Sequence, residues 1–181
     1  FAASNEDWVC AALNELRDER ARGARLHVDF LIIVCSPTIA PLAQALPEAK
    51  EIVACVERTG LSAFVSENPD LDAVTNLLTT RAPRVLIFIG HTDAPHPTTG
   101  ARTLCLSDGA DGLVYVDPNS IDRVFGSASE RLELVFLNGS CSSDRCEALS
   151  APPYRKTTVG WSTMADNSAA KVFSLGLADI L

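Results

Sequence analysis

Two residues that could act together in covalent catalysis stand just after apolar segments of the sequence. His91 follows the apolar run 85–89, and Cys141 comes four residues after the run 132–137. A cysteine thiolate is a strong nucleophile once a base has taken its proton, and histidine is the commonest such base. The pair therefore suggests acyl transfer, with Cys141 as the attacking sulfur and His91 as the general base.

The surroundings of Cys141 favour this hypothesis. A helix is predicted from residue 144, and the positive end of a helix dipole favours a thiolate near it. The backbone amides of Cys141 and Thr92 are then candidate donors to an oxyanion. In the alternative interpretation, Cys141 is an inert small apolar residue and His91 is a hydrogen-bonded structural one. Spacing alone leaves both interpretations open.

The cysteines as a group argue against a metal centre. The sequence has six of them, scattered among apolar neighbours without the spacing of a disulfide-rich scaffold. There is no Cys-x-x-Cys pair, so no zinc site is expected, and nothing indicates an organic cofactor. Reduced thiols of this kind favour a cytoplasmic location.

Composition restricts the class of protein further. The 181 residues suit a single domain over 1–181. Lys and Arg number 15 against 23 Asp and Glu, and the net charge of −8 argues against a nucleic-acid partner. No apolar run is long enough to cross a membrane. The chain starts with Phe1 in place of an initiator Met, as expected for a piece of a longer protein with flanking repeat or regulatory domains.

Strands and helices alternate along the predicted structure. Nearly continuous apolar runs predict strands that are covered on both faces, and apolar residues at helical spacing predict the helices between them. A small β-hairpin, 103–106 and 113–116, interrupts the alternation. The pattern predicts a three-layer αβα sandwich with a mostly parallel central sheet. Predicted strands are 27–35, 61–65, 84–89, 132–137 and 157–161, and predicted helices are 4–22, 47–59, 70–80, 117–124, 144–149 and 167–181.

Three segments taken in order resemble the CHAT domain of the caspase and separase clan of cysteine peptidases. They are 85–91, which ends in Gly-His, 133–143, which holds Asn-Gly-Ser-Cys, and 158–163. The resemblance covers about residues 27–181 and implies a caspase-like fold and a cysteine endopeptidase with Cys141 and His91 as its dyad. Two departures are Thr92, where the family commonly has Gly, and one extra residue before Cys141.

The same resemblance implies a binding region for a protein or peptide substrate. Main-chain pairing along the segment after the last strand would provide affinity, and a pocket would provide specificity. Asp166, with Asp93, would attract a basic side chain, although Asp166 equally suits the N-terminus of a helix. The implied substrate-binding residues are Ser36, Gly139, Trp161, Ser162 and Asp166.

Two other functions stay open at this point. One is a CHAT domain without catalytic activity that serves as a protein-interaction module. The other is a doubly wound domain that binds a small molecule at the carboxyl ends of its strands.

Overall fold

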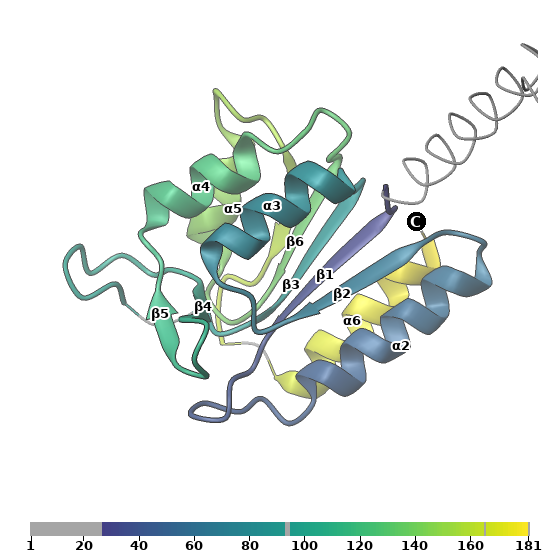
Figure 1. Ribbon diagram of the computed structural model, residues 1–181, viewed down its shortest axis with the longest axis horizontal. Coiled ribbons are helices and arrows are strands. Elements are labelled where there is room, and N and C mark those ends of the chain that lie inside the picture. Colours follow the sequence, from purple (N-terminus) through teal and green to yellow (C-terminus); the bar gives the residue numbers. More distant parts are fainter. Residues whose placement is uncertain (1–26, 93–94, 165, 181) are drawn as a thin grey trace, which may run out of the picture.

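A five-stranded parallel sheet forms the centre of the protein (Figure 1). The computed structural model describes residues 27–92, 95–164 and 166–180, and the strands lie in the order β2-β1-β3-β6-β7. The predicted helix 4–22 lies outside the described residues. The strands are β1 (Phe30–Cys35), β2 (Ala63–Glu67), β3 (Val85–Gly90), β6 (Leu134–Asn138) and β7 (Thr157–Gly160).

The strands are apolar because both faces of the sheet are covered. Successive side chains of a strand point to opposite faces. In β1, Phe30 and Ile32 join the apolar core on one face, whereas Leu31 and Ile33 join the core on the other. All four are buried. A continuous apolar run is therefore what this position in the sheet requires.

Helices cover each face of the sheet (Figure 1). Helices α2 (Ala45–Arg58) and α6 (Asn167–Ile180) lie on one face, and α3 (Leu71–Arg81), α4 (Pro118–Gly126) and α5 (Ser143–Ser150) lie on the other. The predicted three-layer αβα sandwich with a mostly parallel sheet is confirmed. The predicted hairpin is present as the antiparallel pair β4 (Cys105–Ser107) and β5 (Leu113–Tyr115).

Local signals position several helix ends correctly. The Asp70 carboxylate accepts the Ala73 amide at 2.7 Å and caps α3, and Asp117 likewise caps α4 ahead of Pro118. Helix α2 differs from the prediction, since it begins at Ala45 and holds Pro47 as its third residue. The amides of a first helical turn have no partner within the helix, so proline is tolerated there.

The strand order determines where a ligand could bind. The chain passes from β1 to β2 on one side and then returns to β3 on the other side of β1. Connections from neighbouring strands diverge at such a point and leave a crevice beyond the carboxyl ends of the strands. Across the described part of the chain, no helix combines the length and apolar character needed to span a lipid bilayer.

Phe136 tests how far the sheet depends on its buried aromatic side chains. Phe136 is fully buried and contacts Phe173 edge to face, with 5.5 Å between ring centroids. We expect Phe136→Ala to lower the free energy of unfolding by about 3–5 kcal/mol, because a large cavity would remain. The matched control is Val172→Ala on α6, where the side chain is 71% exposed and the change should stay within about 0.5 kcal/mol. Urea unfolding of both variants measures the difference, and equal effects would contradict the packing described here.

Candidate functional site

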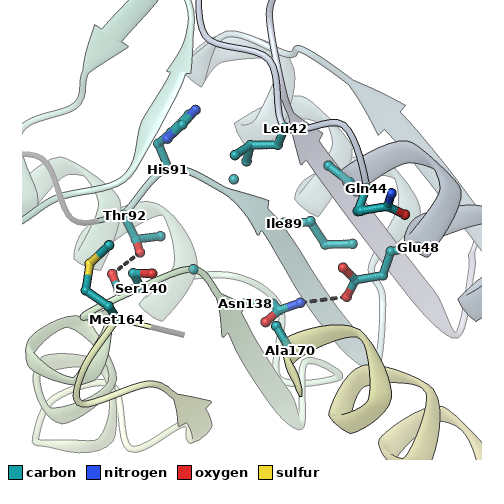
Figure 2. Close-up of a pocket in the computed structure, with 13 residues that line it drawn as sticks. Leu42, Gln44, Glu48, Ile89, His91, Thr92, Asn138, Ser140, Met164 and Ala170 are labelled. Carbon is teal, nitrogen blue, oxygen red and sulfur yellow. Dashed lines mark hydrogen bonds between the residues drawn. The ribbon is translucent and has the colours of Figure 1, made fainter. Parts of the chain in front are cut away.

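A cleft of about 320 Å³ lies at the carboxyl ends of β3 and β6, beside the N-terminal part of α2 (Figure 2). We call it the switch-point cleft, because it occupies the crevice created by the strand order. Apolar side chains form much of its wall, and a few polar groups lie among them. The lining residues are Leu42, Gln44, Ala45, Glu48, Ile89, Gly90, His91, Thr92, Asn138, Gly139, Ser140, Met164 and Ala170.

Glu48 places a buried carboxyl group in the cleft. Its side chain leaves the first turn of α2, and the residue is only 4% exposed. Asn138 Nδ2, at the end of β6, donates to Glu48 Oε1 at 2.6 Å. Ser174 Oγ, on α6, lies 2.6 Å from the same oxygen. Figure 2 shows the other carboxyl oxygen of Glu48 on the side of Ile89 and the cleft.

Further hydrogen bonds hold the Asn138 side chain in place. Its Oδ1 accepts a hydrogen bond from Trp161 Nε1 at 2.9 Å, and its Nδ2 also lies 3.0 Å from Ser174 Oγ. The Trp161 ring packs edge to face on Phe173, with 5.6 Å between centroids. The amide of Asn138 therefore has one orientation, with its NH₂ group towards Glu48.

Burial raises the pKa of the Glu48 carboxyl, because the charged form loses hydration inside the protein. The hydrogen bonds from Ser174 and Asn138 act in the opposite direction, as does the positive charge of Lys171, whereas the negative charge of Glu51 adds to the rise. Lys171 does not pair with Glu48, since its Nζ lies 2.6 Å from Glu51 Oε1. Glu48 is thus a carboxyl held by neutral partners.

His91 and Thr92 both line the cleft, next to Gly139. His91 Nε2 lies 3.0 Å from the Ala40 carbonyl, so this nitrogen carries the proton and Nδ1 is an acceptor in the neutral ring. The hydroxyl of buried Thr92 donates to the Ser140 carbonyl. A side chain at Gly139 would collide with this packing, because a Cβ there would lie 2.5 Å from the Gly90 carbonyl oxygen.

Cys141 does not line the switch-point cleft. It follows β6, the strand beside β3, as the sequence predicts, but its amide donates to the Thr163 carbonyl at 3.0 Å. Ser143 N likewise donates to the Trp161 carbonyl at 3.1 Å. The amide that we predicted as an oxyanion donor is thus used within the protein, because the loop folds back on the segment after β7.

The other residues assigned to a substrate have mostly structural surroundings. Ser36 N donates to Asn68 Oδ1, and Ser36 Oγ accepts the Leu42 amide at 2.6 Å, which holds the loop after β1. Asp166 accepts the amides of Ser168 and Ala169 at the start of α6, as the alternative interpretation predicts. Ser162 is exposed, and neither Ser162 nor Trp161 lines the cleft. Asp93 lies outside the described residues.

Sequence reasoning missed Glu48, Asn138 and Ser174 as functional residues. A signal existed for Glu48, which precedes Ile52 by four positions and Val56 by eight. This spacing places a carboxyl group on the buried stripe of the helix, where charged residues are rare without a partner. Asn138 and Ser174 have no comparable signal, because their proximity to Glu48 arises only when β6 and α6 pack against α2.

Comparison with known proteins identifies the fold. The sequence matches none of the protein families compared and none of the curated proteins. A flavodoxin-like domain from Synechococcus sp. matches 82% of this chain and 93% of its own, with a TM-score of 0.50 and 8% sequence identity. The fold is flavodoxin-like. A diflavin flavoprotein A3 from Nostoc sp. matches 84% of this chain and 90% of its own, with a TM-score of 0.49 and 12% identity. A flavodiiron protein from Giardia intestinalis matches 90% of this chain and 37% of its own, with a TM-score of 0.45 and 12% identity.

This result contradicts the resemblance to the CHAT domain. The matched domain has a flavodoxin-like fold and not a caspase-like peptidase fold, so the predicted cysteine endopeptidase is wrong. The alternative of an inactive CHAT module is equally without support. The roles of nucleophile and base that we assigned to Cys141 and His91 belonged to that interpretation. In this chain the strands that end in Gly-His and are followed by Asn-x-x-Cys lie in a flavodoxin-like sheet, so these short motifs do not by themselves identify a caspase-like fold.

Glu48→Gln tests the effect of the buried carboxyl group on stability. Because the pKa of Glu48 is raised in the folded protein, the native state holds this proton more tightly than the unfolded chain does. The contribution of Glu48 to the free energy of unfolding therefore falls as pH rises from about the ordinary value of 4.5 through the raised pKa. We expect Glu48→Gln to remove this loss, since the amide oxygen keeps both hydrogen bonds and carries no charge. Urea unfolding at several pH values measures it.

Two further variants sharpen the comparison. Glu48→Ala should cost about 1–3 kcal/mol, because it leaves a buried N–H of Asn138 without its acceptor, whereas the Ser174 hydroxyl keeps the Ala170 carbonyl at 2.8 Å. Glu51→Gln, one turn along α2, removes only a surface ion pair with Lys171 and should change stability by less than about 1 kcal/mol. Equal pH dependence in the wild type and Glu48→Gln would contradict the assignment.

Cys141 tests the backbone of the loop after β6. Its φ is +56°, in the left-handed region that favours glycine. This conformation costs an L-residue about 1–2 kcal/mol, whereas glycine adds roughly 0.5–1 kcal/mol of chain entropy to folding. We expect Cys141→Gly to range from neutral to about 1 kcal/mol more stable in thermal unfolding. Cys146→Gly, inside α5, should instead destabilise by at least about 1 kcal/mol. The same sign for both would refute the strained conformation.

Proposed function

We propose that this chain is a ligand-binding domain that holds a small organic molecule in the switch-point cleft. The observation that carries the proposal is the position of the cleft, which lies beyond the carboxyl ends of β3 and β6 and is also lined by Leu42 and Gln44 from the connection after β1, where the strand order reverses. Open parallel sheets bind their ligands at such a point. The mixture of apolar wall and a few converging polar groups also suits a small ligand.

A flavin is the first ligand to consider, because the similar structures include flavoproteins and flavodoxin-like sheets can bind flavin mononucleotide at this crevice. A phosphate group there requires free backbone amides or basic side chains. In the loop after β1, Thr38 N donates to Asp111 Oδ1, Leu42 N donates to Ser36 Oγ, and Pro37 and Pro41 carry no N–H.

The charges around the cleft also argue against a bound phosphate group. No lysine or arginine is among the residues that line it, and Glu48 stands in the first turn of α2, where a phosphate would approach. The residues present therefore do not fit a flavin phosphate. The proposed function is therefore ligand binding without a flavin.

We also propose a cytoplasmic location for this chain and a partner other than nucleic acid. A cytoplasmic location is supported by the free thiols of Cys35, Cys55, Cys141 and Cys146, of which the first two are buried. The net charge of −8 supports a partner other than nucleic acid. We also propose that residues 1–181 act as one domain.

The proposal is tested by NMR titration of the full chain with three probes of one shape: benzamidine, benzamide and benzoate. Each is added to about 5 mM, where a ligand with a dissociation constant of about 1 mM would occupy most of the protein. We expect at least one probe to shift the amide signals of residues 42–48, 89–92 and 138–140. Signals of the hairpin strand β5 serve as the control and should not move.

Flavin mononucleotide is added in a separate titration and is expected to cause no saturable shift. If none of the three probes moves the signals around the cleft, or if they move the hairpin equally, the proposed binding function is wrong.

A further inference from the structure

Several polar groups of the switch-point cleft use their hydrogens within the protein and are left as acceptors. His91 presents the acceptor Nδ1 in its neutral form, since Nε2 donates to the Ala40 carbonyl. The Thr92 hydroxyl proton is used by the Ser140 carbonyl. Both hydrogens of Asn138 Nδ2 are used within the protein, by Glu48 and Ser174. Gln44 also lines the cleft, and its amide can donate as well as accept, so the acceptors named above are the part of the lining that needs a donor from a ligand.

The Glu48 carboxyl group is the strongest of these acceptors. Its Oε1 receives the hydrogen bonds from Asn138 and Ser174, and its other oxygen lies on the cleft side (Figure 2). Among the described residues, no lysine or arginine forms a salt bridge with Glu48. Lys171 has an electrostatic effect on Glu48, but its ammonium group is bound to Glu51.

A buried carboxylate without a cation is an unfavourable arrangement unless something else supplies the charge. Asn138 and Ser174 hold the Glu48 carboxyl group in one position, and Trp161 in turn holds Asn138. Burial raises the pKa of this carboxyl group, so its charged form is disfavoured in the cleft. A positive charge beside the carboxylate would favour its ionised form. The protein thus orients an acceptor towards the open space of the cleft.

We infer that the ligand of the switch-point cleft carries a cationic amidinium, guanidinium or ammonium group that pairs with Glu48, on a body that packs between the apolar side chains of the cleft. This inference rests on the proposed binding function and adds the chemical class of the ligand. A planar amidinium or guanidinium suits a carboxylate especially well, because its N–H groups form parallel charge-assisted hydrogen bonds. The side chains of Leu42, Ile89 and Met164 provide the apolar surroundings.

The test uses the same three probes, because they share one shape and differ in charge. We expect benzamidine to bind the wild-type chain at least tenfold more tightly than benzamide, and benzoate to bind more weakly still. Glu48→Gln should weaken benzamidine binding by about tenfold to a hundredfold, the usual effect of losing a charged hydrogen bond, and should leave benzamide within about twofold. Glu57→Gln is the matched control, because Glu57 is exposed on the same helix and is not among the charges that act on Glu48, and it should leave all three affinities unchanged.

Each outcome has a defined meaning. Amide spectra and thermal unfolding must first show that Glu48→Gln is folded. If it is not, Ser174→Ala takes its place, because it removes one of the two donors to Glu48. This variant should also weaken the binding of benzamidine and leave the binding of benzamide unchanged. If benzamide binds as tightly as benzamidine, or if benzamidine binding survives in Glu48→Gln, the cationic class is wrong while ligand binding stands. If no probe binds in the cleft, the binding function fails and this inference fails with it.

Discussion

The carboxyl group of Glu48 joins three elements that are far apart in the sequence. Its oxygen receives hydrogen bonds from Asn138 at the end of β6 and from Ser174 on α6, while Glu48 itself belongs to α2. A buried carboxyl group is costly unless such partners surround it. Helices α2 and α6 must therefore meet over the end of β6 in the arrangement seen in Figure 1, and the floor of the switch-point cleft follows from that arrangement.

The position of the cleft and its chemistry have separate origins. Its position comes from the order of the parallel strands, which any protein with this topology shares. Its chemistry comes from side chains such as Glu48 and from a loop after β1 in which prolines and internal hydrogen bonds leave few donors. A fold of this kind can hold unrelated ligands, so likeness of the sheet to flavodoxin-like domains does not bring their ligands with it.

The peptidase interpretation failed for a related reason. Gly90 followed by His91, and Asn138 three residues before Cys141, report that two strands end near each other, and the pairing of β3 with β6 confirms that much. They do not report which hydrogen bonds the loops then make. The loop after β6 folds back on residues 161–163, so that the Cys141 amide is used within the protein and Cys141 does not line the cleft that His91 lines.

The sequence by itself determined the layered architecture of this protein. Apolar runs defined the central strands, Asp70 and Asp117 defined helix starts, and the alternation of strands and helices predicted the parallel sandwich, because these signals depend on neighbours a few residues away. Only the tertiary structure decided which polar residues form the site. Glu48, Asn138 and Ser174 are separated by up to 126 positions, and no local pattern records that burial will force them together.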